Sequence, residues 1–149
     1  MIRRSLGSEE LKQEFIPLHE PFFTEQEVSS VGDTIRSGWV STQGNKSLQV
    51  QERVSELTNS AGAVLTNSGT SALHLALETL GIGIGDEVII PSLTFVATAN
   101  SVLYTGARPL ALDVEPEYLS LDPSLVRAFL ESCELKGGAL VNPESGLVV

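Results

Sequence analysis

The chain has 149 residues, 42% of them apolar, and its 9 basic and 19 acidic side chains give a net charge of −10 at pH 7. That length allows one hydrophobic core, and the negative charge argues against nucleic acid or an anionic membrane as a partner. The single cysteine, Cys133, excludes an internal disulfide framework, and without a membrane-length apolar run or an N-terminal signal segment we expect a cytoplasmic protein.

Two helices joined by a polar loop are predicted in the first part of the chain. The sequence TEQE at residues 24–27 fits a capping box, which opens a helix that stops at Gly38. A polar loop over residues 39–46 contains the only tryptophan, and helical spacing returns from Leu48 to Asn59. The apolar positions of these helices are Val28, Val31 and Ile35 in the first and Val50, Val54 and Leu57 in the second.

From residue 63 onward, short apolar runs alternate with helical patterns. The expected elements are a strand over Ala63–Thr66, a helix over Thr70–Leu80, a strand over Glu87–Ile90, a helix over Phe95–Tyr104, a strand over Pro109–Val114 and a helix from Asp122 to about Cys133. The turn signal NPESG, between Ala139–Val141 and Leu147–Val149, predicts a hairpin. Strands alternating with helices predict an α/β fold with a parallel sheet and right-handed crossovers.

The turn NSGTS, residues 67–71, lies where the first of these strands gives way to a helix. A helix that begins there directs its unpaired backbone N–H groups and its positive dipole end at the turn, which suits a phosphate. The same residues suit a plain helix N-cap, and both interpretations stand at this point. A dinucleotide loop fits less well, because the glycines at 81, 83 and 85 precede a strand, whereas that fingerprint must follow one.

Three motifs carry a resemblance to a known family: SGWVSTQG, SGTSALHLAL and GDEVIIPSLTFVATANSVLYTGARPLALDV. Together they resemble the DegT/StrS family of nucleotide-sugar aminotransferases, which are pyridoxal-phosphate enzymes of fold type I. The segment FIPLHEPFFTEQE and the NPESG turn are similar to the branch that serves legionaminic-acid-type sugar synthesis. The similarity runs from about Phe15 to the last residue.

The resemblance implies a fold and a role. Residues 1–14 would be a flexible leader, and residues 15–149 the N-terminal portion of the large, pyridoxal-phosphate-binding domain, an incomplete α/β fold with a mostly parallel sheet and helices on both faces. The full-length enzyme, expected to be a homodimer, would transfer an amino group from glutamate to a 4-keto-6-deoxy nucleotide sugar in cell-surface polysaccharide or nonulosonate biosynthesis.

The resemblance also implies which residues hold the cofactor. Gly69, Thr70 and Ser71 would form the cup for the phosphate of pyridoxal phosphate. Phe95 would lie on the pyridine ring, where stacking adds about 0.5–1.5 kcal/mol beyond burial. Composition alone favours an ordinary core aromatic at Phe95, and the motif around it reverses that preference.

The polar loop after the first helix is the implied substrate site. In the family this loop, which here contains Trp39, Ser41 and Thr42, approaches the sugar nucleotide near the subunit boundary. The alternative is a loop anchored by one buried indole, and both interpretations stay open.

Other titratable side chains receive no chemical role. His74 lies between leucines and is interpreted as a packed, hydrogen-bonded histidine, and His19 lies in a proline-bounded segment without a carboxylate or cysteine beside it. Asp113 ends a strand, where ligands often bind in such sheets, but it does not match the aspartate that pairs with the pyridine nitrogen in the family. No metal ligands are predicted, and Glu9-Glu10 is interpreted as solvated charge.

No catalytic residue is predicted in this chain. Transamination needs a Schiff-base lysine and an acidic residue that keeps the pyridine nitrogen protonated, and in the family both come after the point where this sequence stops. The lysines at 12, 46 and 136 lie in the leader, the polar loop and a turn. Two hypotheses follow. The chain is the N-terminal part of an aminotransferase, or it is a non-catalytic remnant that at most binds phosphate or pairs with a full-length relative. An in-frame continuation of the coding DNA into a lysine-bearing segment would support the first hypothesis over the second. An NAD-binding enzyme fits less well, because Ile90-Pro91 stands where an acidic residue would end the second strand.

Overall fold

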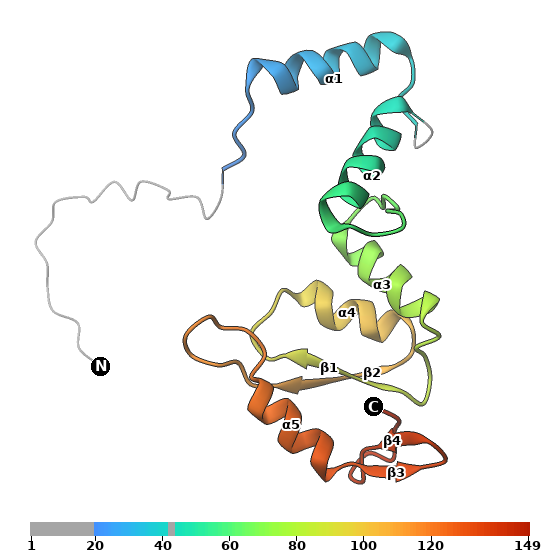
Figure 1. Ribbon diagram of the computed structural model, residues 1–149, viewed down its shortest axis with the longest axis vertical. Coiled ribbons are helices and arrows are strands. Elements are labelled where there is room, and N and C mark those ends of the chain that lie inside the picture. Colours follow the sequence, from blue (N-terminus) through green and yellow to red (C-terminus); the bar gives the residue numbers. More distant parts are fainter. Residues whose placement is uncertain (1–19, 42–43) are drawn as a thin grey trace, which may run out of the picture. The chain divides into compact units, whose positions relative to one another are not determined.

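The computed structural model describes residues 20–41 and 44–149 (Figure 1). The chain divides into two compact units between Arg53 and Val54. Within the residues that the structure describes, no helix combines the length and the apolar composition needed to cross a membrane.

The first unit contains α1 (Glu25–Ser37) and the start of α2 (Asn45–Thr58), in agreement with the two predicted helices. The predicted capping box opens α1: the Glu27 carboxylate accepts a hydrogen bond from the Thr24 backbone N–H at 2.6 Å and another from the Thr24 hydroxyl. Gly38 ends α1 in the left-handed conformation, with φ +74°, and donates its N–H to the carbonyl oxygen of Ile35. The apolar side chains of α1 remain 59–64% exposed at Val28, Val31 and Ile35.

The second unit alternates helices and strands. Its elements are α3 (Gly69–Thr79), β1 (Glu87–Pro91), α4 (Val96–Tyr104), β2 (Arg108–Leu112), α5 (Pro123–Ser132), β3 (Glu134–Lys136) and β4 (Ala139–Val141). The β1 and β2 strands pair in parallel, from Glu87 opposite Arg108 to Pro91 opposite Leu112, which confirms the predicted strand–helix–strand step. At α5, Asp122 caps the helix by accepting the Ser124 N–H at 2.8 Å.

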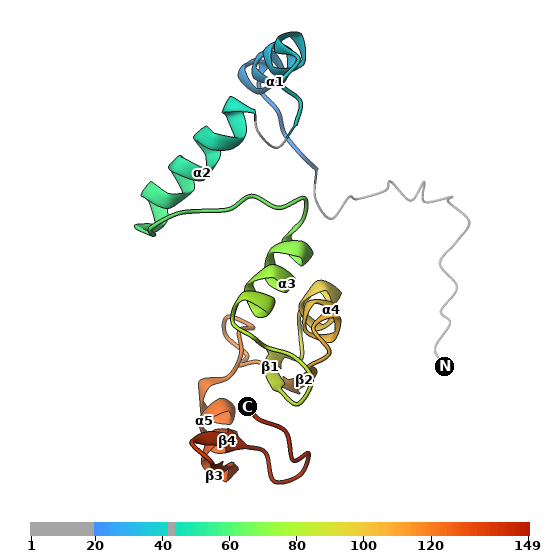
Figure 2. The same ribbon diagram turned by 90° about the vertical axis from the view of Figure 1, so that its right-hand side faces the viewer.

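The core of the second unit lies between the sheet and α4. Its buried apolar residues are Ile90, Val102 and Ala107, with Leu77, Ile82, Val88 and Ala99 packed around them. The α3 and α4 helices lie on one side of the β1–β2 pair, whereas α5 and the β3–β4 hairpin lie on the other (Figures 1 and 2). This is the arrangement expected for part of an α/β domain.

The loops that follow α3 and α4 touch at the amino ends of the two strands. Gly106 has φ +84°, and a Cβ at this position would lie 2.8 Å from the Ile84 side chain, so a larger residue requires the loops to shift. Both helices therefore end at the amino edge of the sheet, and a four-residue loop, residues 92–95, joins the carboxyl end of β1 to the start of α4. The N-terminal first turns of α3 and α4 are therefore the ends of these helices that lie away from the amino edge of the β1–β2 sheet.

Two predicted elements differ from the structure. Residues 63–66 form no strand, and the reason is that a strand needs a neighbour for its backbone hydrogen bonds, which none of the described residues supplies here. The NPESG turn is present, and it brings Val141 opposite Val148 in a single antiparallel bridge. The full hairpin instead joins β3 to β4 through Gly137-Gly138, whose two positive φ angles suit a tight two-residue turn.

Candidate functional site

The N-terminus of α3 reconciles the two interpretations of the turn at residues 67–71. Ser68 is the N-cap, because its Oγ accepts the Ser71 N–H at 3.2 Å. The Ser68 hydroxyl also donates to the Ser71 Oγ at 3.1 Å, which leaves the Ser71 hydroxyl hydrogen able to donate elsewhere. Capping thus uses one backbone donor, and helix geometry leaves the N–H groups of Gly69 and Thr70 without intrahelical partners.

The space above this first turn is open. A Cβ built on Gly69 would meet nothing within 4 Å, while Thr70 and Ser71 are half-buried. Two backbone N–H groups, two hydroxyls and the positive end of the helix dipole form a donor set that suits a phosphate group. The turn also contains a hydrogen bond of its own, in which Thr66 donates its hydroxyl to the Ser68 carbonyl oxygen at 2.8 Å.

Phe95 lies at the start of α4 and is not a core aromatic in this structure. It is the N-cap residue, with φ −70° and ψ 142°, and its side chain is 78% exposed. A phenylalanine offers no acceptor to the first N–H groups of a helix, so this is a weak cap. Both the poor cap and the exposed ring lower local stability, and such departures from local rules concentrate at functional sites.

The carboxyl ends of β1 and β2 are linked by side chains. Ser92, directly after β1, donates its hydroxyl to Oδ1 of Asp113, directly after β2, at 3.1 Å. The same Oδ1 accepts the Val114 N–H at 2.8 Å. This edge is where open α/β sheets bind ligands, and Phe95 follows Ser92 by three residues. Sequence reasoning placed Asp113 at a strand end but did not identify its partner.

A second cluster of hydrogen bonds follows β2. Burial alone would raise the pKa of the Glu115 carboxyl, but the backbone N–H groups of Glu117, Ser120 and Tyr118, together with the Ser120 hydroxyl, outweigh it and lower that pKa. The carboxylate therefore closes a loop in which Leu119 adopts a positive φ of 56°. The groups that donate to this carboxylate all belong to the same loop.

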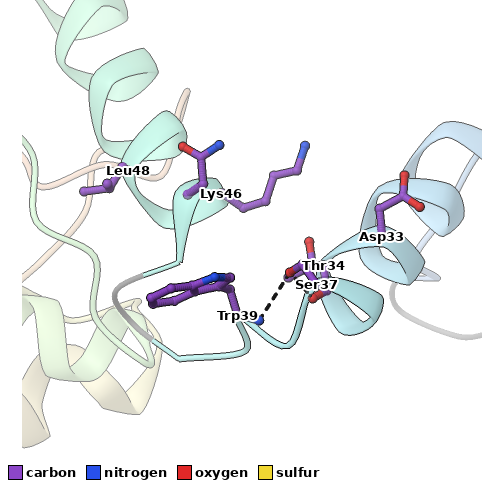
Figure 3. Close-up of a pocket in the computed structure, with 7 residues that line it drawn as sticks. Asp33, Thr34, Ser37, Trp39, Lys46 and Leu48 are labelled. Carbon is purple, nitrogen blue, oxygen red and sulfur yellow. Dashed lines mark hydrogen bonds between the residues drawn. The ribbon is translucent and has the colours of Figure 1, made fainter.

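Trp39 lines a pocket of about 420 Å³ in the first unit (Figure 3). The pocket lies between the end of α1 and the start of α2, and its lining residues are Asp33, Thr34, Ser37, Trp39, Asn45, Lys46 and Leu48. The indole is 62% exposed, so the alternative of a buried anchor does not hold in this structure. Figure 3 shows the Lys46 side chain extending from the first turn of α2 toward α1, above the indole.

The other two residues of the predicted substrate loop are placed differently. Ser41 does not line the pocket, and its carbonyl oxygen accepts the Gly44 N–H at 3.1 Å. Thr42 lies outside the described residues. A Cβ on Gly44 would lie 3.0 Å from the Trp39 carbonyl oxygen, so this glycine permits the tight loop that presents the indole. Asn45 and Lys46 were missed as pocket residues, because the sequence predicts a helix from Leu48, whereas α2 begins at Asn45.

His74 packs against Tyr104, and the two rings meet edge to face with centroids 5.7 Å apart. The expected hydrogen bond is not formed: Nε2 of His74 lies 3.3 Å from Oε1 of Glu78 but has no hydrogen-bond partner among the described residues. Within residues 20–41 and 44–149, no group of three or more histidine, cysteine, aspartate or glutamate side chains is placed to hold a metal ion.

Comparison with known proteins gives a consistent answer. The DegT/DnrJ/EryC1/StrS aminotransferase family profile matches residues 21–135. The UDP-4-amino-4-deoxy-L-arabinose–oxoglutarate aminotransferase of Shewanella sediminis is 42% identical over 120 residues, which are 80% of this chain and 31% of that protein. The GDP-perosamine synthase of Escherichia coli O157:H7 is 40% identical over 103 residues, 69% of this chain and 28% of that protein. The chain thus spans about a third of the length of these curated relatives.

Solved structures agree on the fold. A Streptococcus pneumoniae protein described as a sugar aminotransferase, solved in a PLP form, superposes with a TM-score of 0.69 at 37% identity, over 76% of this chain and 29% of that one. The aminotransferase TlmJ of Streptoalloteichus hindustanus gives a TM-score of 0.68 at 33% identity, over 77% of this chain and 32% of that one. The predicted fold, an incomplete α/β large domain of fold type I, is confirmed.

Proposed function

Because the chain belongs to the DegT/DnrJ/EryC1/StrS aminotransferase family, we propose that it is the N-terminal part of a pyridoxal-phosphate-dependent nucleotide-sugar aminotransferase. In this proposal, residues 15–149 belong to the large domain of that enzyme. The observation that carries the proposal is the first turn of α3, whose donors face open space at Gly69.

The phosphate of the cofactor would be held by Gly69, Thr70 and Ser71. The glycine lets the phosphate approach the backbone N–H groups, and the two hydroxyls add donors on either side. These donors are neutral, so the positive end of the α3 dipole supplies the electrostatic part of the binding. Bound pyridoxal phosphate would supply an electron sink and carry the amino group between donor and acceptor.

Phe95 would cover one face of the pyridine ring. Its exposed position at the N-cap of α4 is poor for folding and suitable for stacking, which adds about 0.5–1.5 kcal/mol beyond burial. A ring held flat against an aromatic side chain is fixed in orientation while its phosphate stays in the α3 turn.

The nucleotide sugar would be recognised by the loop that holds Trp39, Ser41 and Thr42. The exposed indole suits an aromatic base, and the Lys46 ammonium at the same pocket suits a phosphate oxygen. We propose a 4-keto-6-deoxy nucleotide sugar as acceptor and glutamate as donor. The Shewanella sediminis relative supports this donor, because its name pairs an amino-sugar nucleotide with oxoglutarate, the keto acid that glutamate yields. The complete enzyme would be a cytoplasmic homodimer in polysaccharide biosynthesis, in the legionaminic-acid-type branch.

The 149-residue chain by itself is expected to show no transaminase turnover. Neither of its two described lysines follows the α3 turn in the setting that the reaction needs: Lys136 lies in the β3–β4 hairpin with its Nζ 2.6 Å from a Glu134 carboxylate oxygen, and Lys46 lines the pocket at Trp39. Borohydride reduction that trapped the cofactor covalently on either lysine, with matching turnover, would contradict this expectation.

The test uses this chain joined in frame to the part of the Shewanella sediminis relative that follows the matched region. Equilibrium dialysis would measure the Kd for pyridoxal 5′-phosphate, and circular dichroism would check folding. We expect the joined protein to bind pyridoxal 5′-phosphate. Gly69→Val should weaken binding on the order of tenfold, about 1.4 kcal/mol, because its methyl groups occupy the phosphate space.

Two matched variants control for the change of residue. Gly62→Val also adds a side chain into open space, but away from the α3 turn, and His74→Ala removes a packed ring. Both should leave the Kd within about twofold, a difference of roughly 0.4 kcal/mol. A joined protein that folds but does not bind, or equal losses in Gly69→Val and the controls, would overturn the proposal.

A further inference from the structure

We infer that Ser92 and Asp113 are positioning residues, which hold the loop between β1 and α4 so that Phe95 is presented to the cofactor ring. This inference rests on the proposed function of Phe95. Neither side chain needs to touch the cofactor, because each acts through the backbone of the loop.

The first step of the argument is how the two strand ends are joined. The Ser92 N–H donates to the carbonyl oxygen of Leu112 at 2.7 Å, so the parallel ladder extends one residue past β1. The Ser92 hydroxyl then donates to Oδ1 of Asp113 at 3.1 Å, and that oxygen also accepts the Val114 N–H at 2.8 Å. One carboxylate oxygen thus ties the start of the loop to the residues after β2.

The second step is that little else fixes the ring. Only two residues separate Ser92 from Phe95, and the exposed ring is placed by the backbone rather than by packing. The Thr94 hydroxyl pairs with the Thr98 hydroxyl at 2.9 Å, which is a bond within the start of α4. Among the hydrogen bonds of the described residues, Ser92–Asp113 is the side-chain bond that connects this loop to a second strand.

The third step concerns the acceptor oxygen. Oδ1 of Asp113 accepts both the Ser92 hydroxyl and the Val114 N–H, so it limits the positions that the Ser92 hydroxyl can take. Asparagine at 113 keeps an acceptor oxygen of the same reach without the charge. The positioning role therefore predicts that Asp113→Asn retains most of the effect, whereas Asp113→Ala loses it.

The first measurement uses the joined protein without cofactor. Hydrogen–deuterium exchange with mass spectrometry would follow the amide at position 92, which donates to the Leu112 carbonyl oxygen. Ser92→Ala and Asp113→Ala should each speed its exchange about fivefold, the change expected for one net hydrogen bond of roughly 1 kcal/mol. Asp113→Asn and Ser92→Thr should match the unsubstituted protein. So should the control Ser132→Ala, which removes an exposed serine hydroxyl that donates to the Phe129 carbonyl oxygen. An amide that already exchanges fast in the unsubstituted protein, or that exchanges equally in all variants, would overturn the inference.

The second measurement is a double-mutant cycle for pyridoxal 5′-phosphate binding in the joined protein. Asp113→Ala should weaken binding about fivefold when Phe95 is present and leave it unchanged in a Phe95→Ala background, because the carboxylate acts only through the ring. Equal effects in both backgrounds, or no effect of Asp113→Ala while Phe95→Ala does weaken binding, would overturn the inference and leave the proposed function standing. A folded joined protein that binds no cofactor would overturn the proposed function, and with it the link from the loop to the cofactor.

Discussion

The α1 helix and the β1–α4–β2 segment are both formed as the sequence predicts, yet only the second buries its apolar residues. In α1, Val28, Val31 and Ile35 lie on one face and stay exposed, whereas in the second segment Ile90 and Val102 are buried. A capping box and a C-terminal glycine are enough to delimit a helix, because their hydrogen bonds are local. Burial requires a partner surface, and only β1–α4–β2 has one among the described residues.

Because α1 leaves its apolar face exposed and, among the described residues, only the β1–α4–β2 segment has a core, we predict that the 149-residue chain unfolds without a sharp transition. An intact domain has a net stability of only about 5–15 kcal/mol, and here the buried core is small. Among the described residues, Val148 bridges the amino end of β1, and no further strand covers the outer edges of the β1–β2 pair. Thermal unfolding followed by circular dichroism should be broad, with aggregation. A cooperative transition of a soluble monomer, with well-dispersed amide NMR signals, would contradict this.

Two valines give the sharpest contrast between the segments. Val102→Asp places a charge in the core at a side chain that is 2% exposed, and should destabilise the second unit by roughly 3 kcal/mol or more. Val31→Asp makes the same change on the exposed face of α1 and should change little. Hydrogen exchange of the β1 amides would measure both effects. Similar exchange in the two variants would show that the core does not hold the second unit together.

A smaller loss is expected at the buried carboxylate of β1. The Glu87 Oε2 accepts the Asn142 amide at 2.6 Å, and its Oε1 lies 3.6 Å from Nε of Arg108. Glu87→Ala leaves the buried Asn142 amide without this acceptor, which costs about 1–3 kcal/mol. The control Glu134→Ala removes an exposed carboxylate paired with Lys136, and should cost less than about 1 kcal/mol. Hydrogen exchange of the Asn142 amide would compare the two variants. Equal losses of protection would contradict the claim that the buried carboxylate contributes more to stability than the exposed one.

The smallest effect concerns the pH dependence of α1. The Thr24 hydroxyl and then its backbone N–H lower the pKa of the Glu27 carboxyl. A lowered pKa means that the capping box stabilises α1 above the ordinary pKa of glutamate and that this contribution is lost as the pH falls through the lowered value. Carbon chemical shifts of residues 25–29 should report less helix in acid, and Thr24→Ala should reduce that change. An equal loss of helix in acid in the wild-type chain and in Thr24→Ala would show that the capping box is not its cause.

The sequence was informative where the determinants are local. The β-branched run of β1, the Asp122 cap of α5 and the glycine that ends α1 are signals within a few residues. Ala63–Thr66 has an equally apolar sequence and forms no strand, because pairing depends on residues elsewhere in the chain. Gly137-Gly138 is a short-range hairpin signal as well, and it forms the two-strand ladder, whereas the NPESG turn forms a single bridge.

The same limit applies to the candidate site: positions set by neighbouring residues are predictable, and contacts between distant residues are not. The turn at residues 67–71 and the position of Phe95 follow from the order of strand, loop and helix. The bond between Ser92 and Asp113 depends on strand register, which a single sequence does not specify. The pocket at Trp39 depends on how α1 and α2 approach each other, so Lys46 was read only as a loop lysine.

The parallel pairing of β1 with β2 also has a kinetic consequence. Ser92 and Asp113 are only 21 residues apart, so this strand–helix–strand segment closes a short loop compared with pairings across a whole domain. During synthesis, the segment can form as soon as β2 has left the ribosome, before any later strand is available. We expect it to be the first part of the chain to gain protection, which pulse-labelled hydrogen exchange during refolding would detect as early protection of Ile90 and Leu110. Its free strand edges would then serve as the template on which later strands add.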